Sequence, residues 1–161
     1  MIRPAGPQDA TAIAAIWNPV IRSSVATFNS AEKPVEEIAA LIAARQSDGH
    51  GFFVAEDHVA VLGFAHYGQF RGGVGYRHTG EHTVILSPDA GGRGLGRALM
   101  ARIEDHARDG GMHSLFAGVS AENTAGVAFH AALGYAQVAR LAQVGRKFDR
   151  WFDLILMQKM L

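Results

Sequence analysis

Residues 88–99 have the spacing that is most informative about chemistry in this 161-residue chain. They follow a β-rich run over 82–87, and Leu95, Leu99 and Ile103 then recur at four-residue spacing, which predicts a helix. The first amides of a helix lack partners within the helix, and the helix dipole places partial positive charge there. A strand, a glycine-rich turn and a helix N-terminus in this order therefore predict a cradle for a phosphate group.

The glycines and arginines of this segment suit a pyrophosphate. Gly92, Gly94 and Gly96 lack the β-carbons that would keep a pyrophosphate away from the backbone, and Arg93 and Arg97 can add full positive charges. The segment is not a P-loop, because Lys-Ser or Lys-Thr does not follow its last glycine. It is not a dinucleotide fingerprint either, because its glycines recur at every second residue. The structural alternative is that the glycines only mark the entry to a helix.

Glu81 lies on the strand that leads into this loop and is a candidate general base. Strand alternation places Thr79, Glu81 and Thr83 on one face and His82 on the other. An ammonium group has no lone pair, so an amine that attacks a thioester must first lose a proton, and a nearby carboxylate can take it. The ordinary pKa of Glu, about 4.3, is low for this task, so partial burial would have to raise it. The structural alternative is a solvated carboxylate or an ion pair with Arg77.

Asn123 and His130 form a second candidate pair. They are seven residues apart on a predicted helix and therefore project from the same side, which Gly126 leaves open. A histidine can protonate a departing thiolate near neutral pH. The structural alternatives are an N-cap role for Asn123 and a partly buried helix histidine for His130.

The composition describes an ordinary globular domain, with 48% hydrophobic and 19% charged residues. Fifteen basic and fifteen acidic side chains cancel, so there is no electrostatic case for a nucleic acid or an anionic membrane as partner. The absence of cysteine excludes disulfides, thiolate metal sites and a cysteine nucleophile. No signal-peptide core and no apolar run of about 18–20 residues is present. We therefore expect a cytoplasmic protein with one domain over residues 1–161.

Hydrophobic periodicity and turn residues predict the elements that hold these groups. The predicted strands are 2–4, 51–56, 59–70, 79–87, 114–119 and two within 137–161 that are joined around 145–148. The predicted helices are 10–22 with Asp9 as N-cap, 34–48, a helix that follows the glycine-rich turn and ends at 110–111, and 123–133. This order predicts a mixed α/β sheet with helices on both faces, and an open loop over 71–78.

The glycine-rich loop resembles the Arg/Gln-x-x-Gly-x-Gly/Ala loop of GNAT-superfamily acetyltransferases, which holds the pyrophosphate of acetyl-CoA. Its first basic or amide position falls on Gly91 here, so one side-chain contact that is common in that family is missing. GNAT enzymes also carry an Asn, a side chain seven residues later that protonates the CoA sulfur, and a Leu-Gly-Phe/Tyr end. This chain has Asn123, His130 and 133–135 in those places. The resemblance implies a largely antiparallel six- to seven-stranded sheet with helices on both faces, and acetyl-CoA as co-substrate.

The whole chain is similar to the phosphinothricin N-acetyltransferase branch of that superfamily. The landmarks of this branch occur in order at 16–18, 26–28, 67–68, Arg71, 75–77, 79–82, Asn123, His130, 144–148 and 150–151. Members acetylate the α-amino group of small amino-acid analogues such as phosphinothricin, methionine sulfoximine or methionine sulfone. The resemblance thus implies direct transfer of acetyl to a small amine in a ternary complex. Gly72, Gly73 and Gly80 depart from the pattern and imply a looser wall of the acceptor pocket.

Carried over residue by residue, the resemblance implies that Glu81 is the base and that His130 assists the sulfur. The implied cofactor contacts are Val84, Ile85, Leu86, Gly92, Arg93, Gly94, Leu95, Gly96, Arg97 and Asn123. The implied acceptor pocket is formed by Phe28, Arg71, Arg77, Glu81, His82, Thr83, Lys147 and Phe148, with an arginine that pairs with the substrate carboxylate. Because relatives are commonly dimers, we expect a homodimer in which a partner subunit can supply the last two residues.

Other classes of function are less consistent with the chain. His78 and His82 start about 13 Å apart on an extended strand, at roughly 3.3 Å per residue, which is too far to share one metal ion through ~2 Å bonds. We therefore expect no metal. The nucleophile sequence Gly-x-Ser-x-Gly of serine hydrolases is absent. A non-catalytic acyl-CoA sensor would have the same loop, although Glu81 and His130 argue against it. A GNAT enzyme that acts on peptide or protein N-termini also remains open.

Overall fold

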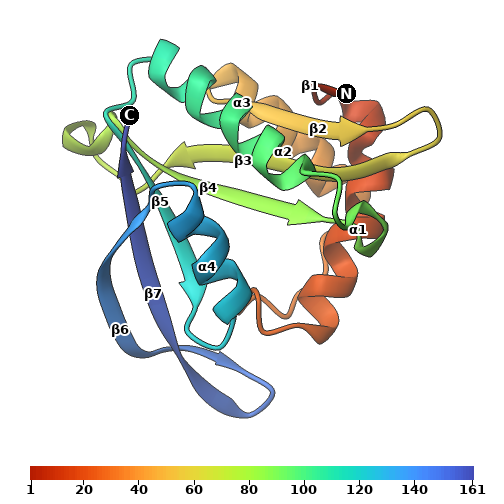
Figure 1. The fold of residues 1–161 in the computed structure, drawn as a ribbon. Helices are drawn as coiled ribbons and strands as arrows, with labels where there is room; N and C mark the ends of the chain where they lie inside the picture. The colour runs from red at the N-terminus through yellow and green to blue at the C-terminus, as the bar shows by residue number, and fades with distance from the viewer.

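A seven-stranded sheet forms the centre of the computed structural model, which describes residues 1–161 (Figure 1). In the order β1-β2-β3-β4-β5-β7-β6, all neighbouring strands are antiparallel except β4 and β5, which are parallel. The strands are β1 (Ile2–Pro4), β2 (Phe52–Glu56), β3 (Val61–Gln69), β4 (Thr79–Leu86), β5 (Ser114–Ser120), β6 (Ala136–Lys147) and β7 (Arg150–Met160). The expected mixed, largely antiparallel sheet is therefore confirmed.

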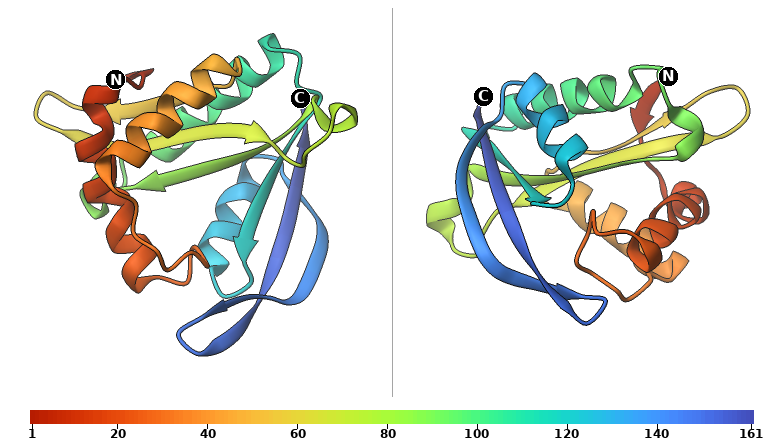
Figure 2. Two further views of the ribbon diagram at one scale, coloured as in Figure 1. Left: turned by 180° about the vertical axis from the view of Figure 1, so that it is seen from behind. Right: turned by 60° about the horizontal axis from the view of Figure 1, so that its bottom comes forward.

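Four α-helices cover the sheet, two on each face (Figures 1 and 2). Their bounds are α1 (Ala10–Ser23), α2 (Val35–Ser47), α3 (Leu95–Asp109) and α4 (Thr124–Ala132), with short 3₁₀ turns at Pro7–Asp9, Val74–Tyr76 and Pro88–Ala90. The apolar faces of α1 and α2 form one core with Phe52, Val54 and Phe64 of the sheet. The face of α3 forms a second core with β-strand residues of the opposite face, and α4 packs against it. No helix is long and apolar enough to cross a bilayer.

The pairing between β4 and β5 ends early. Only Thr79, Gly80 and Glu81 of β4 pair with β5, opposite 114–116. Beyond Glu81, β4 continues along β3, whereas β5 continues along β7. The two strands therefore diverge, as Figure 1 shows, and their facing edges beyond this point are not paired with each other.

The C-terminal hairpin turns later than the sequence predicts. Its turn is Phe148–Asp149, and both residues have positive φ, 51° and 58°. Gly145, expected in the turn, instead lies within β6, and a β-carbon there would overlap the ring of Phe28. That glycine therefore serves close packing between the hairpin and the segment after α1, which local sequence could not reveal.

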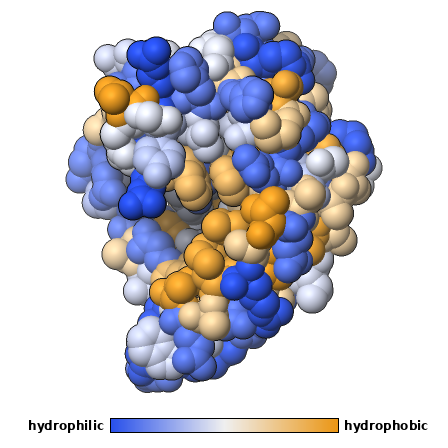
Figure 3. Space-filling model, turned by 90° about the vertical axis from the view of Figure 1, so that its left-hand side faces the viewer, coloured by the Kyte–Doolittle hydropathy of each residue, from blue (hydrophilic) through white to orange (hydrophobic).

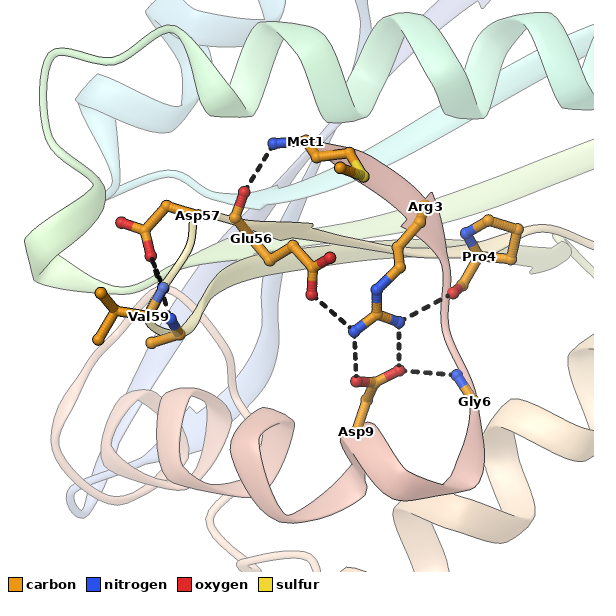
Figure 4. A network of polar contacts seen from close by, with 9 residues as sticks. Met1, Arg3, Pro4, Gly6, Asp9, Glu56, Asp57 and Val59 are labelled. Carbon is orange, nitrogen blue, oxygen red and sulfur yellow. Dashed lines mark hydrogen bonds and ion pairs between the residues drawn. The ribbon is translucent and has the colours of Figure 1, made fainter.

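A polar network ties the N-terminus to the sheet (Figure 4). Arg3 donates to both carboxylate oxygens of Asp9 at 2.8 Å and to Glu56 at 2.7 Å. The amide of Gly6 also donates to Asp9. Asp9 does precede α1, as expected, but its buried carboxylate bonds to Arg3 and Gly6 rather than capping that helix. The network thus joins β1, β2 and the start of α1.

Replacing Asp9 with asparagine is expected to lower the free energy of unfolding at pH 7 by about 1–3 kcal/mol, because Arg3 loses a charge-assisted partner. Hydrogen bonds from Arg3 hold the folded-state pKa of Asp9 below its ordinary value. The stabilisation is therefore complete above the unfolded-state pKa of about 3.9 and is lost as the pH falls through the folded-state pKa. Urea unfolding at pH 7 and at pH 3 measures both effects.

Asp105→Asn is the matched control. Asp105 pairs with Arg108 at 2.9 Å, but its side chain is 65% exposed, so we expect a loss of about 0.5 kcal/mol or less. An Asp9→Asn loss no larger than that of the control would contradict the structural importance of the network.

Candidate active site

A cavity of about 270 Å³ opens where β4 and β5 diverge. Its lining comes from both strands, from α1 and the segment after it, from the start and body of α4, and from β7: Trp17, Ala26, Thr27, Phe28, Glu81, His82, Thr83, Val84, Ile85, Ala117, Gly118, Val119, Ser120, Asn123, His130 and Leu154. Because α1 and α4 lie on opposite faces of the sheet, this cavity passes through the opening between the strands. Groups on the two faces of β4 can therefore act on one bound molecule.

Glu81 points to the face of β4 that α1 and α2 cover. Its Oε1 lies 3.3 Å from the position that a β-carbon on Gly118 would occupy, so this glycine of β5 makes room for the carboxylate. Burial raises the pKa of Glu81, which is the direction that a general base requires. The ion pair with Arg77 considered from the sequence does not form; Arg77 instead lies 3.0 Å from His78.

His82 points to the opposite face of β4, as strand alternation predicts. It is buried, and its Nε2 lies 2.9 Å from the Nε2 of His130. The Nδ1 of His130 lies 2.8 Å from the carbonyl oxygen of Gly126. The ring of Tyr135 lies 5.4 Å from each imidazole, centroid to centroid, in an edge-to-face arrangement. Burial lowers the pKa of both histidines, that of His82 to about 3, so both rings are neutral at pH 7.

The glycine-rich loop has the backbone shape that a phosphate cradle requires. Gly92 and Gly94 have φ of 72° and 69°, a left-handed conformation that disfavours other residues. No atom lies within 4 Å of where their β-carbons would stand, so the space beside them is open. The amides of residues 92–97 have no backbone acceptor, and the amide of Ala98 is the first to bond back into the loop, to Gly94. These features fit a pyrophosphate bound at the N-terminus of α3.

The two arginines of this loop differ. Arg93 donates to Asp57 at 2.9 Å and so ties the loop to the turn between β2 and β3. Asp57 also accepts the amides of Val59 and Ala60, and these bonds hold its pKa at about 2. Arg97 forms no ion pair. Of the two, Arg97 is thus the cation that remains free for a ligand.

The other expected cofactor residues lie along the diverging edge of β4 and at the start of α4. Val84 and Ile85 line the cavity, and Leu86 at the end of β4 packs near Gly96, whose β-carbon would stand 3.2 Å from it. Asn123 both lines the cavity and caps α4, because its Oδ1 accepts from the amide of Gly126 at 3.0 Å. The two interpretations of Asn123 are therefore compatible.

The expected acceptor residues are divided between two places. Phe28, Glu81, His82 and Thr83 line the cavity, whereas Arg71, Arg77, Lys147 and Phe148 do not. Arg71 and Arg77 instead line a second, polar hollow of about 860 Å³, together with Arg45 and His50 among others. Neither arginine lines the first cavity, so within one chain neither is placed to pair with the carboxylate of a molecule bound there.

Lys147 does not line the cavity but holds a segment of its wall in place. It is buried, and its Nζ donates to the carbonyl oxygens of Ser24 at 2.6 Å and Thr27 at 2.9 Å. These bonds fix the segment that carries Phe28 into the cavity wall. Phe148, next in sequence, is 52% exposed at the tip of the hairpin.

The four glycines that depart from the family pattern have different surroundings in the structure. Gly72 faces open space, and a β-carbon on Gly91 would make only an ordinary contact, 3.7 Å from the carbonyl oxygen of Pro88. Gly73 has φ of 103°, a conformation that side chains disfavour. Gly80 does not line the cavity, and a β-carbon there would stand 2.6 Å from a methyl group of Leu115, so the side chain of Leu115 fills the space beside this glycine.

Several cavity residues were not selected from the sequence, chiefly Trp17 and the β5 segment 117–120. Trp17 packs against Phe64 and His66, with ring centroids 4.9 and 5.9 Å apart. In the sequence, Trp17 is marked only by its place in the landmark at 16–18 of the phosphinothricin N-acetyltransferase branch. The β5 residues had no signal, because their contribution depends on where the strand leaves β4.

Comparison with known proteins identifies the family. Residues 2–156 match the model of the acetyltransferase (GNAT) domain. Over 157 residues the chain is 40% identical to L-amino acid N-acyltransferase MnaT of Escherichia coli, covering 98% of this chain and 91% of that protein. It is 38% identical to the L-methionine sulfoximine/L-methionine sulfone acetyltransferase of Salmonella typhimurium (98% and 92% covered). It is 36% identical to phosphinothricin N-acetyltransferase of Alcaligenes faecalis (94% and 77% covered).

A solved structure agrees. The acetyltransferase yncA of Salmonella typhimurium, solved with acetyl-CoA, superposes with a TM-score of 0.96 at 38% identity, covering 100% of this chain and 93% of that one. This chain belongs to the GNAT acetyltransferase family and is an acyltransferase. Among GNAT enzymes, its relatives include those named for methionine sulfoximine, methionine sulfone and phosphinothricin. No group of three His, Asp or Glu side chains is placed to hold a metal ion.

Replacing Gly94 with alanine is expected to weaken CoA binding at least tenfold. The new β-carbon would enter the open space beside the free amides, and the left-handed backbone would add strain of about 1–2 kcal/mol. Isothermal titration with CoA measures the change. Gly72→Ala is the control, because Gly72 also faces open space but has no left-handed φ, and it should leave CoA affinity unchanged. Equal affinities for the two variants would argue against a phosphate site at this loop.

Proposed function

We propose that this protein transfers the acetyl group of acetyl-CoA directly to the α-amino group of a small amino acid or amino-acid analogue, within a ternary complex. The observation that carries this proposal is that Glu81 and His130, from opposite faces of the sheet, line one cavity. The names of the relatives support the substrate class, because they specify methionine sulfoximine, methionine sulfone and phosphinothricin.

The residues of the loop and of β4 would hold acetyl-CoA, which supplies an activated thioester when bound. The free amides of residues 92–97 and the unpaired Arg97 suit the pyrophosphate. The diverging edge of β4 at Val84 and Ile85 offers backbone groups to an extended pantetheine arm. An amide at this edge can stabilise negative charge that develops on the acetyl oxygen, an effect worth roughly 3–4 kcal/mol in other enzymes.

Glu81 would take the proton that the acceptor ammonium must lose before its nitrogen attacks the thioester carbon. As the new N–C bond forms, the C–S bond breaks, and CoA leaves as a thiolate that takes a proton from water. Its carboxylate reaches into the cavity, and its raised pKa brings it closer to that of the group it deprotonates. The base acts when it is ionised, so the rate should rise with pH through the pKa of Glu81, which burial raises above its ordinary value.

The shape of the cavity favours a small acceptor over a peptide or protein N-terminus. Its volume of about 270 Å³ is at the lower end of what a small ligand needs. Phe28 and the segment that Lys147 holds close it on the α1 side. A peptide chain that continues beyond the first residue would have to displace that segment.

The homodimer is part of the same proposal. Apolar side chains that are more than one-third exposed follow β6, its turn and β7: Val138, Leu141, Val144, Phe148, Trp151 and Met160. Figure 3 shows apolar surface on the side of the molecule where β6 lies. β6 is also an edge strand of 12 residues, and such edges are usually covered. A second copy of the chain would bury this surface.

Replacing Glu81 with glutamine is expected to lower kcat by about 10²-fold or more, the usual contribution of a general base, with little change in CoA affinity. The variant should also lose the rise of rate with pH. Thiol release from acetyl-CoA, with methionine sulfone, methionine sulfoximine, phosphinothricin, free amino acids and a short peptide as acceptors, measures this. Glu122→Gln is the control, since Glu122 pairs with Arg150 outside the cavity.

Two results would overturn the proposal. A wild-type protein that binds CoA but releases no thiol with any amine would be an acyl-CoA sensor. A peptide acceptor that is faster than every amino acid would assign the enzyme to N-termini.

Introducing aspartate at both Val144 and Trp151 is expected to convert a dimer into a monomer, because two charges would enter an apolar contact. Light scattering after size-exclusion chromatography measures the mass. Val59→Asp is the control, because Val59 is 92% exposed on the turn between β2 and β3 and should leave the mass unchanged. A monomeric wild type, or a dimeric double variant, would reject this interface.

A further inference from the structure

The chemistry of the bonded groups determines which atom donates and which accepts in the hydrogen bonds of His82 and His130. The carbonyl oxygen of Gly126 can only accept, so the Nδ1 of His130, 2.8 Å away, carries the hydrogen. In a neutral imidazole the other nitrogen then has a lone pair. The Nε2 of His130 must therefore accept, and the Nε2 of His82, at 2.9 Å, must donate. The Nδ1 of His82 is left without hydrogen and is buried without a partner.

The surroundings of the pair favour uncharged rings. His66 on β3 is buried, and burial lowers its pKa to about 3, so it is neutral as well. Behind Tyr135, Glu104 of α3 is paired with Lys159 of β7 at 2.6 Å. Burial raises the pKa of Tyr135, so its hydroxyl stays neutral too. Glu81, the neighbour of His82 on β4, points to the opposite face of the strand, and no carboxylate bonds to either imidazole.

The location of this bond is also specific. Glu81 is the last residue of β4 that pairs with β5, so His82 is the first residue beyond the pairing. Its hydrogen bond joins β4 to α4 across 48 positions of the sequence, and both residues line the cavity. A group at this place can set the position of His130 relative to the strand that carries Glu81.

We propose that His82 is a positioning residue that acts through His130: by donating its Nε2–H, it holds His130 in the Nδ1–H tautomer, fixes the ring in the cavity wall and keeps it uncharged. The resting His130 then holds no hydrogen on the nitrogen that faces His82. In the resting enzyme, His130 is therefore a fixed, neutral side chain in the cavity wall and not a protonated general acid. The use of this arrangement in catalysis rests on the proposed function, whereas the arrangement itself does not.

Nuclear magnetic resonance of the full-length protein with ¹⁵N-labelled histidines tests the arrangement without reference to activity. In the wild type, we expect His130 as the Nδ1–H tautomer, with a pKa below the ordinary 6.5. His82→Phe keeps a ring but removes the donor that stabilises the neutral form, so the pKa of His130 should rise toward its ordinary value. His82→Gln retains a donor at a similar reach and should keep that pKa low. His113→Phe is the control, since His113 is exposed and distant in the sequence from both.

Each other outcome counts against the proposal. An Nε2–H tautomer of His130 in the wild type would overturn it even if no variant folds. A fall in the His130 pKa in His82→Phe would mean that His130 donates as a cation, and no change would mean that the bond has no effect.

A pH profile of thiol release provides the second readout. In the wild type, the rate should fall as the pH drops through the raised pKa of Glu81, while burial keeps His130 neutral to a lower pH than an exposed histidine. In His82→Phe, a raised His130 pKa would charge part of the rings at mildly acidic pH, so the ratio of the rate at pH 6 to the rate at pH 8 should be lower than in the wild type. His82→Gln should restore the wild-type profile. If the wild type releases no thiol from any amine, the proposed function fails while the resonance experiment still decides the role of His82.

Discussion

The early end of hydrogen bonding between β4 and β5 is the constraint on which the site depends. The two parallel strands share only three residue pairs, so beyond these pairs the backbone N–H and C=O groups on their facing edges do not bond to each other. Unpaired backbone groups are costly to bury, so such an opening suits a ligand with polar groups along its length. It also connects the two faces of the sheet, which would otherwise be separated by a continuous layer of backbone. The cavity and its lining by residues from both faces of the sheet follow from it.

Burial has opposite effects on the two neighbouring titratable residues at this opening. Low dielectric disfavours the charged form of any group, so it raises the pKa of Glu81 and lowers that of His82. Strand alternation keeps the two side chains on opposite faces, and each therefore meets a different set of neighbours. The result is a carboxylate that is a better base and an imidazole pair that stays neutral. One physical effect thus prepares two different chemical environments a single residue apart.

Support for the cavity comes from groups that do not touch it. Lys147 bonds to two carbonyl oxygens in the segment after α1, and Gly145 lets the ring of Phe28 lie directly on the backbone of β6. The hairpin of β6 and β7 therefore sets the position of the opposite wall. Arg93 holds the glycine-rich loop to the turn before β3 in a similar way. These contacts explain why basic residues near the site are not all available to a ligand.

The sequence by itself determined the elements, the glycine-rich loop before α3 and the opposite faces of Glu81 and His82, because periodicity, glycine conformation and helix entry depend on neighbours within a few residues. Only the tertiary structure decided which of these groups meet. The separation of Arg71 and Arg77 from the cavity, the supporting role of Lys147, the packing role of Gly80 and Gly145, and the bond between His82 and His130 all depend on which strands pair and where their pairing stops. That point is set by the packing of helices and strands distant in the chain, so no local pattern contains it.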